Sequence, residues 1–228
     1  MGGGGFSFGR DWEALDDFVM GLTGVAKPKI AFLPTASGDA DEYVVRYYNS
    51  FIPKPCSPTH LALFTRTVVD LREYILDQDL VYVGGGNTAN MLAVWRLHGL
   101  DVILREAWEA GVVMCGMSAG SLCWFEGGTT DSFGLDLSAL RDGLGFLTGS
   151  FSPHYDGEAK RRPAYHRFIA EGALANGMAA DNGVGVHFVG TEFVEALSVH
   201  DGLHAYRVEL VDGNVKETQI EPRVLPRV

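Results

Sequence analysis

The stretch "GVVMCGMSAG", residues 111–120, places a short apolar run directly before a serine that is flanked by glycines. Its β-branched and apolar start is typical of a buried strand. Gly116 and Gly120 lie two residues before and two residues after Ser118. That spacing is the outline of a nucleophile elbow, a strained strand-to-helix turn that lifts a serine hydroxyl clear of a sheet. Small residues also collect at ordinary tight turns, so the outline alone does not separate a nucleophile from a structural serine.

This stretch is the third of three apolar runs that alternate with helical patterns. The two earlier runs are "KIAFLPTAS" (29–37) and "DLVYVGGGN" (79–87), and each ends in a polar or glycine-rich loop. Between the second and third runs, "TANMLAVWRLHG" (88–99) and "DVILREAWEAG" (101–111) carry apolar residues at helical spacing. Strands that alternate with helices are typical of βαβ units, so the pattern predicts an α/β fold around a mostly parallel sheet.

The pattern changes after residue 183, where short apolar runs follow one another without helical stretches. Gly or Asp turns separate these runs, which are "VGVHFVG" (184–190), "EFVEALSV" (192–199) and "AYRVELVDG" (205–213). Strands joined by tight turns predict an antiparallel edge at the C-terminal end of the sheet. The sequence contains neither a linker nor an internal repeat, so we expect a single domain over residues 1–228.

The chain opens with "MGGGGFSFG" (1–9), in which glycines follow the first residue directly. In an α/β fold such glycines normally come after a first strand. We therefore expect that a first strand is absent from this sequence.

The composition is that of a folded domain with an acidic surface. Of the 228 residues, 46% are apolar and 21% are charged, and the formal net charge is −11. This charge argues against a nucleic-acid partner, because phosphate binding relies on clustered Lys and Arg. The only dense basic run, Lys160-Arg161-Arg162, is typical of a solvated helix start.

The sequence also gives an expectation for the cellular compartment. No stretch reaches the ~18 to 20 uninterrupted apolar residues of a membrane span, and the N-terminus lacks the basic and apolar regions of a signal peptide. The three cysteines, Cys56, Cys115 and Cys123, have no CxxC spacing. We expect a cytoplasmic protein that does not bind membranes.

Two loops at the ends of predicted strands carry the residues that could form a site. Ligands of open α/β sheets sit where loops leave the carboxyl ends of the strands. The loop Gly84-Gly85-Gly86-Asn87 lets the backbone approach a ligand closely, and the Ser118 turn places the N–H of Ala119 beside the serine. We expect the two loops to be neighbours because they follow consecutive predicted strands. They predict an oxyanion hole with donors from Gly85 or Gly86 and from Ala119.

A cofactor explanation of the same glycines is weaker. Gly84, Gly86 and Ala89 satisfy the spacing of a dinucleotide fingerprint, but that motif needs an acidic residue at the end of the next strand. Met117 and Ser118 occupy that position. The sequence also lacks a phosphate-binding GxxxxGK[ST] loop and a zinc-binding HExxH helix, so we expect no cofactor and no metal.

A serine nucleophile needs a base, and His154 is the strongest candidate among seven histidines. It lies in "SFSPHYDGE" (150–158), where Pro153 restricts the entry and the following residues form a polar turn. His187 alternates with apolar residues in a predicted strand, which favours a structural role. The remaining histidines have no distinguishing context; they are His60, His98, His166, His200 and His204.

These residues together resemble the peptidase E family, the aspartyl dipeptidase group of serine peptidases that also includes cyanophycinase. The resemblance covers most of the chain and follows an ordered series of motifs: "FLPTASGD", "VYVGGGNT", "GMSAGS", "TDSFG", "PHYD" and "ADNG". It implies a flavodoxin-like three-layer α/β/α sandwich, with Ser118 as the nucleophile and His154 as the base. It also implies metal-free hydrolysis of short peptides from the amino end, in many relatives by a homodimer.

Two residues are expected to bind the substrate. Asn87 ends the glycine-rich loop 84–87, and the resemblance implies that Arg162 matches a family arginine that recognises an acidic side chain of the substrate.

The third member of the expected triad is where this chain departs from its relatives. Relatives carry a carboxylate just before a glycine, whereas this chain reads Asp181-Asn182-Gly183. An amide can orient an imidazole but cannot neutralise its positive charge, and loss of the carboxylate from a serine triad can cost ~10⁴ in rate. Three alternatives remain open: Asn182 itself, Asp181, or another acid such as Asp131 or Glu192.

The sequence therefore predicts a serine peptidase that hydrolyses dipeptides or short peptides. One alternative is an α/β-hydrolase-type esterase, which has the chain order Ser, acid, His and would take its acid from Asp131, Asp136 or Asp142. Another alternative is a non-catalytic binding protein that has lost activity through Asn182. Homodimer formation is expected from the resemblance alone.

Overall fold

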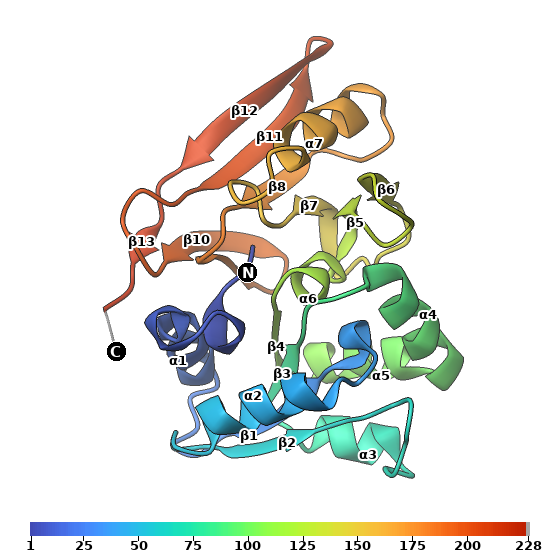
Figure 1. Cartoon of the computed structure of the whole chain (residues 1–228), viewed down its shortest axis with the longest axis vertical. Helices are drawn as coiled ribbons and strands as arrows, with labels where there is room; N and C mark the ends of the chain where they lie inside the picture. The colour runs from blue at the N-terminus through green and yellow to red at the C-terminus, as the bar shows by residue number, and fades with distance from the viewer. Residues whose placement is uncertain (227–228) are drawn as a thin grey trace.

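Four parallel strands form the sheet that carries the Ser118 turn (Figure 1). The computed structural model describes residues 1–226. The strand order is β2-β1-β3-β4, and every neighbouring pair is parallel. The strands are β1 (Lys29–Leu33), β2 (Ser57–His60), β3 (Leu80–Val83) and β4 (Val113–Gly116). The α/β class and the parallel sheet predicted from the three apolar runs are confirmed.

Helices cover both faces of this sheet because successive side chains of a strand point in opposite directions. Phe32 and Tyr82 pack in one apolar cluster with α1 and α2, whereas Val81 and Val83 pack in another with α3, α4 and α5. The crossover helices predicted between residues 88 and 111 are present as α4 and α5. The helices are α1 (Ala14–Leu22), α2 (Asp41–Phe51), α3 (Leu71–Leu76), α4 (Thr88–His98) and α5 (Leu100–Glu109).

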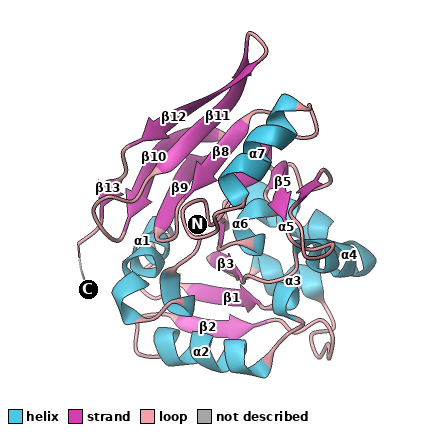
Figure 2. Cartoon of the chain, turned by 45° about the horizontal axis from the view of Figure 1, so that its top comes forward, coloured by secondary structure: helices cyan, strands magenta, loops and turns pink. Residues whose placement is uncertain are grey.

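A six-stranded mixed sheet forms the second part of the molecule, with α7 packed against it (Figure 2). Its order is β12-β11-β8-β7-β5-β6. The pairs β5–β7 and β7–β8 are parallel and the other three are antiparallel. The strands are β5 (Phe125–Thr130), β6 (Ser138–Leu140), β7 (Leu147–Ser152), β8 (Gly177–Ala180), β11 (Ala205–Val211) and β12 (Asn214–Ile220).

A three-stranded sheet and a few short helices complete the fold. In that sheet β10 pairs antiparallel with β9 and parallel with β13. Its strands are β9 (Val184–Val189), β10 (Glu192–Ser198) and β13 (Arg223–Val224). The remaining helices are α6 (Ala119–Leu122), α7 (Arg161–Ala170) and the 3₁₀ turns η1 (Gly5–Ser7), η2 (Arg10–Trp12) and η3 (Thr35–Ser37).

The strands do not form the one central sheet with an antiparallel edge that the sequence pattern suggests. No ladder within residues 1–226 joins β4 to β9. Met1 and Gly2 lie between the two strands instead, where the Met1 nitrogen donates to the Gly116 carbonyl at 2.9 Å and the Gly2 N–H donates to the Val184 carbonyl at 2.9 Å. An apolar groove of about 720 Å³ also separates the strands. The predicted antiparallel strands after residue 183 are present, but they are divided between two sheets.

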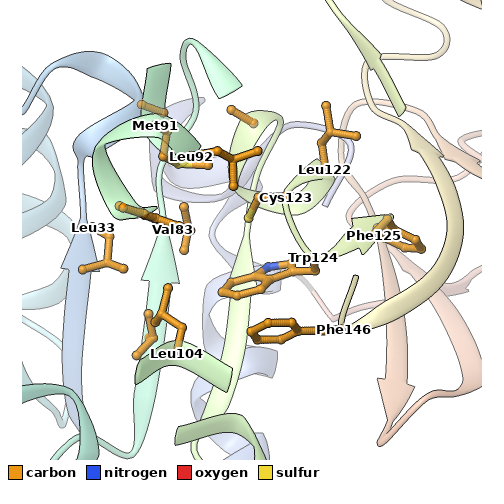
Figure 3. Close-up of a cluster of buried hydrophobic side chains, with 14 of the residues drawn as sticks. Leu33, Val83, Met91, Leu92, Leu104, Leu122, Cys123, Trp124, Phe125 and Phe146 are labelled. Carbon is orange, nitrogen blue, oxygen red and sulfur yellow. The ribbon is translucent and has the colours of Figure 1, made fainter. Parts of the chain in front are cut away.

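The largest apolar cluster joins the parallel sheet to the second part of the molecule (Figure 3). Leu33 and Val83 pack on one side of it, and Trp124, Phe125 and Phe146 extend it beyond α6. This core holds the start of α6, and therefore the Ser118 turn, against both sheets. None of the helices in residues 1–226 combines the length and the apolar character that crossing a membrane requires.

Candidate active site

The Ser118 turn has the backbone geometry of a nucleophile elbow. Ser118 has φ 53° and ψ −115° between β4 and α6, in a region that costs a non-glycine residue roughly 1–3 kcal/mol. A Cβ on Gly116 would run into the Gly120 carbonyl, and a Cβ on Gly120 would run into the Val83 carbonyl. The two glycines are therefore needed for the close approach of α6 to the strand ends. The surrounding packing holds Ser118 in a conformation that exposes its hydroxyl to the neighbouring loops.

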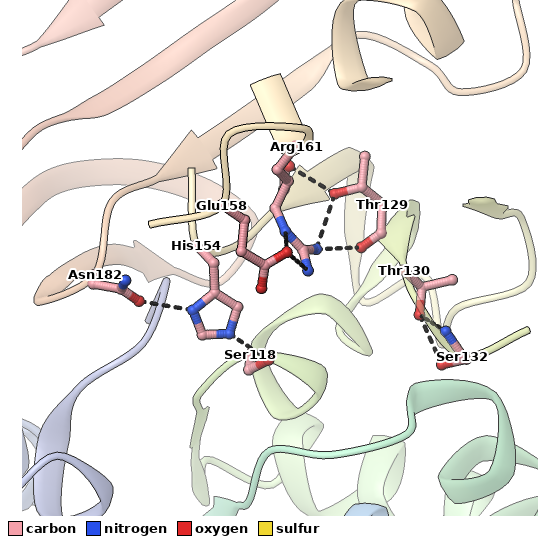
Figure 4. Close-up of polar contacts among 9 residues, drawn as sticks. Ser118, Thr129, Thr130, Ser132, His154, Glu158, Arg161 and Asn182 are labelled. Atoms are coloured by element: carbon pink, nitrogen blue, oxygen red, sulfur yellow. Dashed lines mark hydrogen bonds and ion pairs between the residues drawn. The ribbon is translucent and has the colours of Figure 1, made fainter. Parts of the chain in front are cut away.

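His154 lies directly beside this serine (Figure 4). Its Nε2 is 2.8 Å from the Ser118 Oγ, and its Nδ1 is 2.7 Å from the Asn182 Oδ1. An amide oxygen can only accept, so Nδ1 carries the proton and Nε2 is free to accept from the serine hydroxyl. His154 itself has φ 53°, and its backbone N–H donates to the Gly2 carbonyl at 3.1 Å. The structure thus brings together Ser118, His154 and Asn182.

Burial keeps the imidazole neutral. It lowers the pKa of His154 below the ordinary histidine value, while the hydrogen bond to Asn182 acts in the opposite direction and the Arg161 charge adds to the lowering. A neutral imidazole at neutral pH can take a proton from a hydroxyl, which is the requirement for a general base.

The other candidates for the third position do not contact His154. Asp181 is buried, and its Oδ2 accepts from the His204 N–H at 2.9 Å and from the Tyr206 hydroxyl at 3.4 Å. Its carboxyl group therefore faces away from the imidazole, contrary to that alternative, and burial raises its pKa. No hydrogen bond within residues 1–226 joins Asp131 or Glu192 to His154.

The backbone amides near Ser118 narrow the choice of oxyanion donors. The Gly85 N–H already donates to the Tyr43 hydroxyl at 3.1 Å, so it is not available to a ligand. In residues 1–226 the N–H groups of Gly86 and Ala119 have no acceptor. Both residues line the same cavity as Ser118. Of the three predicted oxyanion donors, Gly86 and Ala119 have N–H groups that are available to a ligand, whereas Gly85 does not.

Comparison with protein families matches residues 1–196 to the description "Peptidase family S51". The chain belongs to peptidase family S51. It is 47% identical over 225 residues to the uncharacterized peptidase YgaJ of Bacillus subtilis (strain 168), a match that covers 99% of this chain and 97% of that protein. It is also 25% identical over 201 residues to peptidase E of Pasteurella multocida (strain Pm70), covering 83% of this chain and 82% of that one. The resemblance to peptidase E found in the sequence is confirmed.

Solved structures of low sequence identity share the fold of this S51 peptidase. A peptidase from an acI-B1 actinobacterium aligns with a TM-score of 0.67 at 16% identity, covering 95% of this chain and 92% of that chain. A protein described as a putative peptidase E from Listeria monocytogenes EGD-e aligns with a TM-score of 0.52 at 18% identity, covering 89% and 93%. The α/β arrangement of parallel and mixed sheets is therefore a peptidase E-like fold.

The cavity of the S51 peptidase at Ser118 has a volume of about 290 Å³. Gly86, Ala119 and His154 contribute to its wall, and Asn87 lies at the start of α4. The Asn87 side chain is already engaged, because Oδ1 accepts from the Asn90 N–H at 2.8 Å and Nδ2 donates to the Ser132 carbonyl at 3.1 Å. Asn87 thus lines the cavity and shapes it, while its side-chain amide holds neighbouring loops.

The arginine in this cavity is Arg161 and not the predicted Arg162. The Arg162 guanidinium stacks on Tyr155 and Tyr206, at 4.8 and 4.6 Å from the ring centroids, and its Nε is 3.4 Å from the Glu217 Oε2. It lies outside the cavity lining. Arg161 is only 3% exposed and faces the cavity. The basic run 160–162 indicated in the sequence that an arginine could lie at the site. The sequence alone did not show which of the two arginines faces the cavity.

The acids required by the esterase alternative are bound elsewhere. Asp142 pairs with Arg96 at 2.8 Å, and Asp136 lies at the surface 3.8 Å from the Lys160 Nζ. Asp131 lines the cavity without a bond to the imidazole. Neither Asp136 nor Asp142 is among the hydrogen-bond partners of His154 in residues 1–226. Residues 1–226 also contain no cluster of three or more His, Cys, Asp or Glu side chains that could hold a metal ion.

Proposed function

We propose that this S51 peptidase is a serine exopeptidase that hydrolyses dipeptides or short peptides from the N-terminal side. The observation that carries the proposal is the chain of contacts from Ser118 Oγ through His154 to Asn182, with distances of 2.8 and 2.7 Å. The strained turn at Ser118 supports the same conclusion, because such backbone strain persists at sites where geometry serves the chemistry.

The reaction begins when Ser118 Oγ attacks the carbonyl carbon of the scissile peptide bond. His154 Nε2 takes the hydroxyl proton as the new C–O bond forms. The tetrahedral intermediate collapses, the C–N bond breaks, and the leaving amine takes the proton from His154. Water then attacks the acyl-enzyme with His154 again acting as base, which releases the acid and restores the Ser118 hydroxyl.

Gly86 and Ala119 stabilise the negative charge that develops on the carbonyl oxygen. Within the described part of the chain, residues 1–226, their N–H groups have no acceptor, and both residues line the cavity with the serine. One such donor is typically worth ~2.7 to 4 kcal/mol of barrier.

Asn182 takes the position of the third group. Its Oδ1 fixes the imidazole tautomer, as a carboxylate does, but it adds no negative charge to stabilise the imidazolium. We therefore expect a working but weakened site. The neighbouring Asp181 contributes to the turn that presents Asn182, because it accepts from the His204 N–H.

The size of the cavity supports short substrates. A volume of about 290 Å³ is just below the roughly 300–1,000 Å³ of ligand pockets and suits one or two residues better than a long chain. A flavodoxin-like sandwich, a cytoplasmic location and a homodimer stay predictions from the sequence.

A panel of dipeptides with free and N-acetylated amino termini tests the proposal. We expect amino acids to be released from the free dipeptides and not from their N-acetylated counterparts, with mass spectrometry as the readout. Hydrolysis of both sets at equal rates would contradict the exopeptidase assignment. Absence of hydrolysis across the whole panel would contradict peptidase activity of this kind.

A further inference from the structure

A buried arginine forms part of the cavity wall near Ser118, and its charge is already paired (Figure 4). The Arg161 Nε and Nη2 donate to the Glu158 Oε2 at 2.9 and 2.7 Å. Its Nη1 donates to the Thr129 carbonyl at 3.1 Å. The Arg161 side chain is 4% exposed, whereas that of Glu158 is 45% exposed. Glu158 is therefore the solvent-exposed partner of the pair, and the Arg161 guanidinium has little contact with solvent.

The charged groups of the cavity sum to a negative value. Arg161 contributes one positive charge, and Asp131 and Glu158 each contribute one negative charge, which leaves a formal charge of −1. His154 adds nothing because burial lowers its pKa. A substrate carboxylate entering this cavity would meet net negative charge, and it would have to displace Glu158 before it could bind Arg161.

We infer that Glu158, by occupying Arg161, makes the site select short peptides whose N-terminal side chain is uncharged over those whose N-terminal side chain is acidic. This inference rests on the proposed exopeptidase function. Like-charge contact is a common device of specificity, because it weakens the wrong ligand without contributing to the right one. An uncharged side chain leaves the Arg161–Glu158 pair intact, whereas an aspartate side chain competes with it.

The adjacent arginine provides a matched control. Arg162 also pairs with a glutamate, Glu217, but its guanidinium lies on Tyr155 and Tyr206 outside the cavity. Each pair joins an arginine to a glutamate, but Glu158 accepts two hydrogen bonds from Arg161, whereas Glu217 lies 3.4 Å from Arg162. Of the two pairs, Arg161–Glu158 lines the cavity with Ser118 and Arg162–Glu217 does not. Neutralising each glutamate therefore separates an effect inside the cavity from a general change of charge.

The test compares two dipeptides of nearly equal shape, Asn-Leu and Asp-Leu. We expect the wild-type protein to have a kcat/KM for Asn-Leu that exceeds the value for Asp-Leu by about tenfold or more, as expected for like charges at close range. In the Glu158→Gln variant, this ratio should fall by about tenfold through faster turnover of Asp-Leu. In the Glu217→Gln variant, the ratio should stay as in the wild type.

The outcomes distinguish the inference from the function on which it rests. Turnover that depends on Ser118 but favours Asp-Leu in the wild type would overturn the inference alone. An unchanged ratio in Glu158→Gln, with a melting temperature like that of the wild type, would overturn the role of Glu158. If Glu158→Gln does not fold, the wild-type ratio still decides the selectivity. Absence of Ser118-dependent turnover of either dipeptide would contradict the proposed exopeptidase function itself.

Discussion

The two ends of the contact chain through His154 differ in what fixes them. At the Ser118 end, backbone contacts at Gly116 and Gly120 leave no room for a Cβ, so the turn is determined by sterics. At the Asn182 end, a hydrogen-bonding side chain sits in a turn where the adjacent Asp181 points the other way. The serine end thus has the geometry of an active elbow, while the other end lacks the negative charge that normally accompanies it. A serine site can therefore keep the backbone geometry of its nucleophile turn while it lacks the negative charge of the third group.

The largest effect is expected at the serine end. Replacing Ser118 by Ala removes the nucleophile, and we expect kcat to fall by roughly 10⁴- to 10⁶-fold on any dipeptide that the wild type cleaves. Steady-state kinetics on the purified variant measure the effect. Ser50→Ala is the control, because Ser50 lies in α2 away from the cavity and should leave kcat unchanged. Equal turnover by wild type and Ser118→Ala would eliminate the serine mechanism.

A gain is expected at the opposite end. Asn182→Asp supplies a carboxylate 2.7 Å from Nδ1, where it can stabilise the imidazolium, and kcat should rise by about ten- to hundredfold. Asp181→Asn, one residue earlier, should not raise kcat, because its side chain contacts His204 and Tyr206 instead. A fall or no change in Asn182→Asp would mean that another residue assists the imidazole.

A smaller loss is expected from a residue behind the glycine loop. The Tyr43 hydroxyl accepts from the Gly85 N–H at 3.1 Å and from the Ser7 hydroxyl at 2.7 Å, and it donates to the Met117 sulfur at 3.3 Å. It therefore joins the loop that carries Gly86 to the residue before Ser118. Tyr43→Phe should lower kcat by about tenfold. The Gly86 N–H would be held less firmly but still present, and this raises the barrier less than complete loss of an oxyanion donor does.

The KM should change little in Tyr43→Phe, because the hydroxyl lies behind the loop and not in the cavity lining. Ser7→Ala, which removes only one of the donors to Tyr43, serves as the milder comparison. A rise in KM with constant kcat would contradict a positioning role for this tyrosine.

The smallest effect is a shift along the pH axis. Activity requires neutral His154, and burial lowers its pKa, so the acid limb of kcat/KM should lie below pH 6.5, the ordinary value. A carboxylate at position 182 favours the charged imidazole, so the limb should move to higher pH in Asn182→Asp. An identical acid limb in both proteins would show that residue 182 does not act on His154.

Sequence patterns were sufficient where local constraints decide the structure. The Gly116 and Gly120 spacing predicted the elbow, and the polar turn after Pro153 predicted the base, because both depend on a few neighbouring residues. Alternating apolar runs likewise predicted the parallel sheet. Asn182 became a candidate through the resemblance, which places the third group just before a glycine, because an Asn-Gly pair by itself indicates only a turn.

Other features depend on contacts between distant segments. Whether Gly85 or Gly86 has a free N–H depends on Tyr43, which lies 42 residues away in α2. Consecutive residues of a helix point about 100° apart, so only the docked orientation of α7 shows that Arg161 faces the cavity and Arg162 does not. The separation of the four-stranded sheet from the three-stranded sheet depends on Met1 and Gly2, which bond to the edges of β4 and β9.

The activation of Ser118 by His154 is tested most directly by labelling with a fluorophosphonate probe, followed by mass spectrometry of the modified peptide. We expect one adduct on Ser118 in the wild type, none in Ser118→Ala, and labelling slowed by about a hundredfold or more in His154→Gln. An intact protein that carries no adduct on Ser118, or that labels equally fast without His154, would contradict this activation.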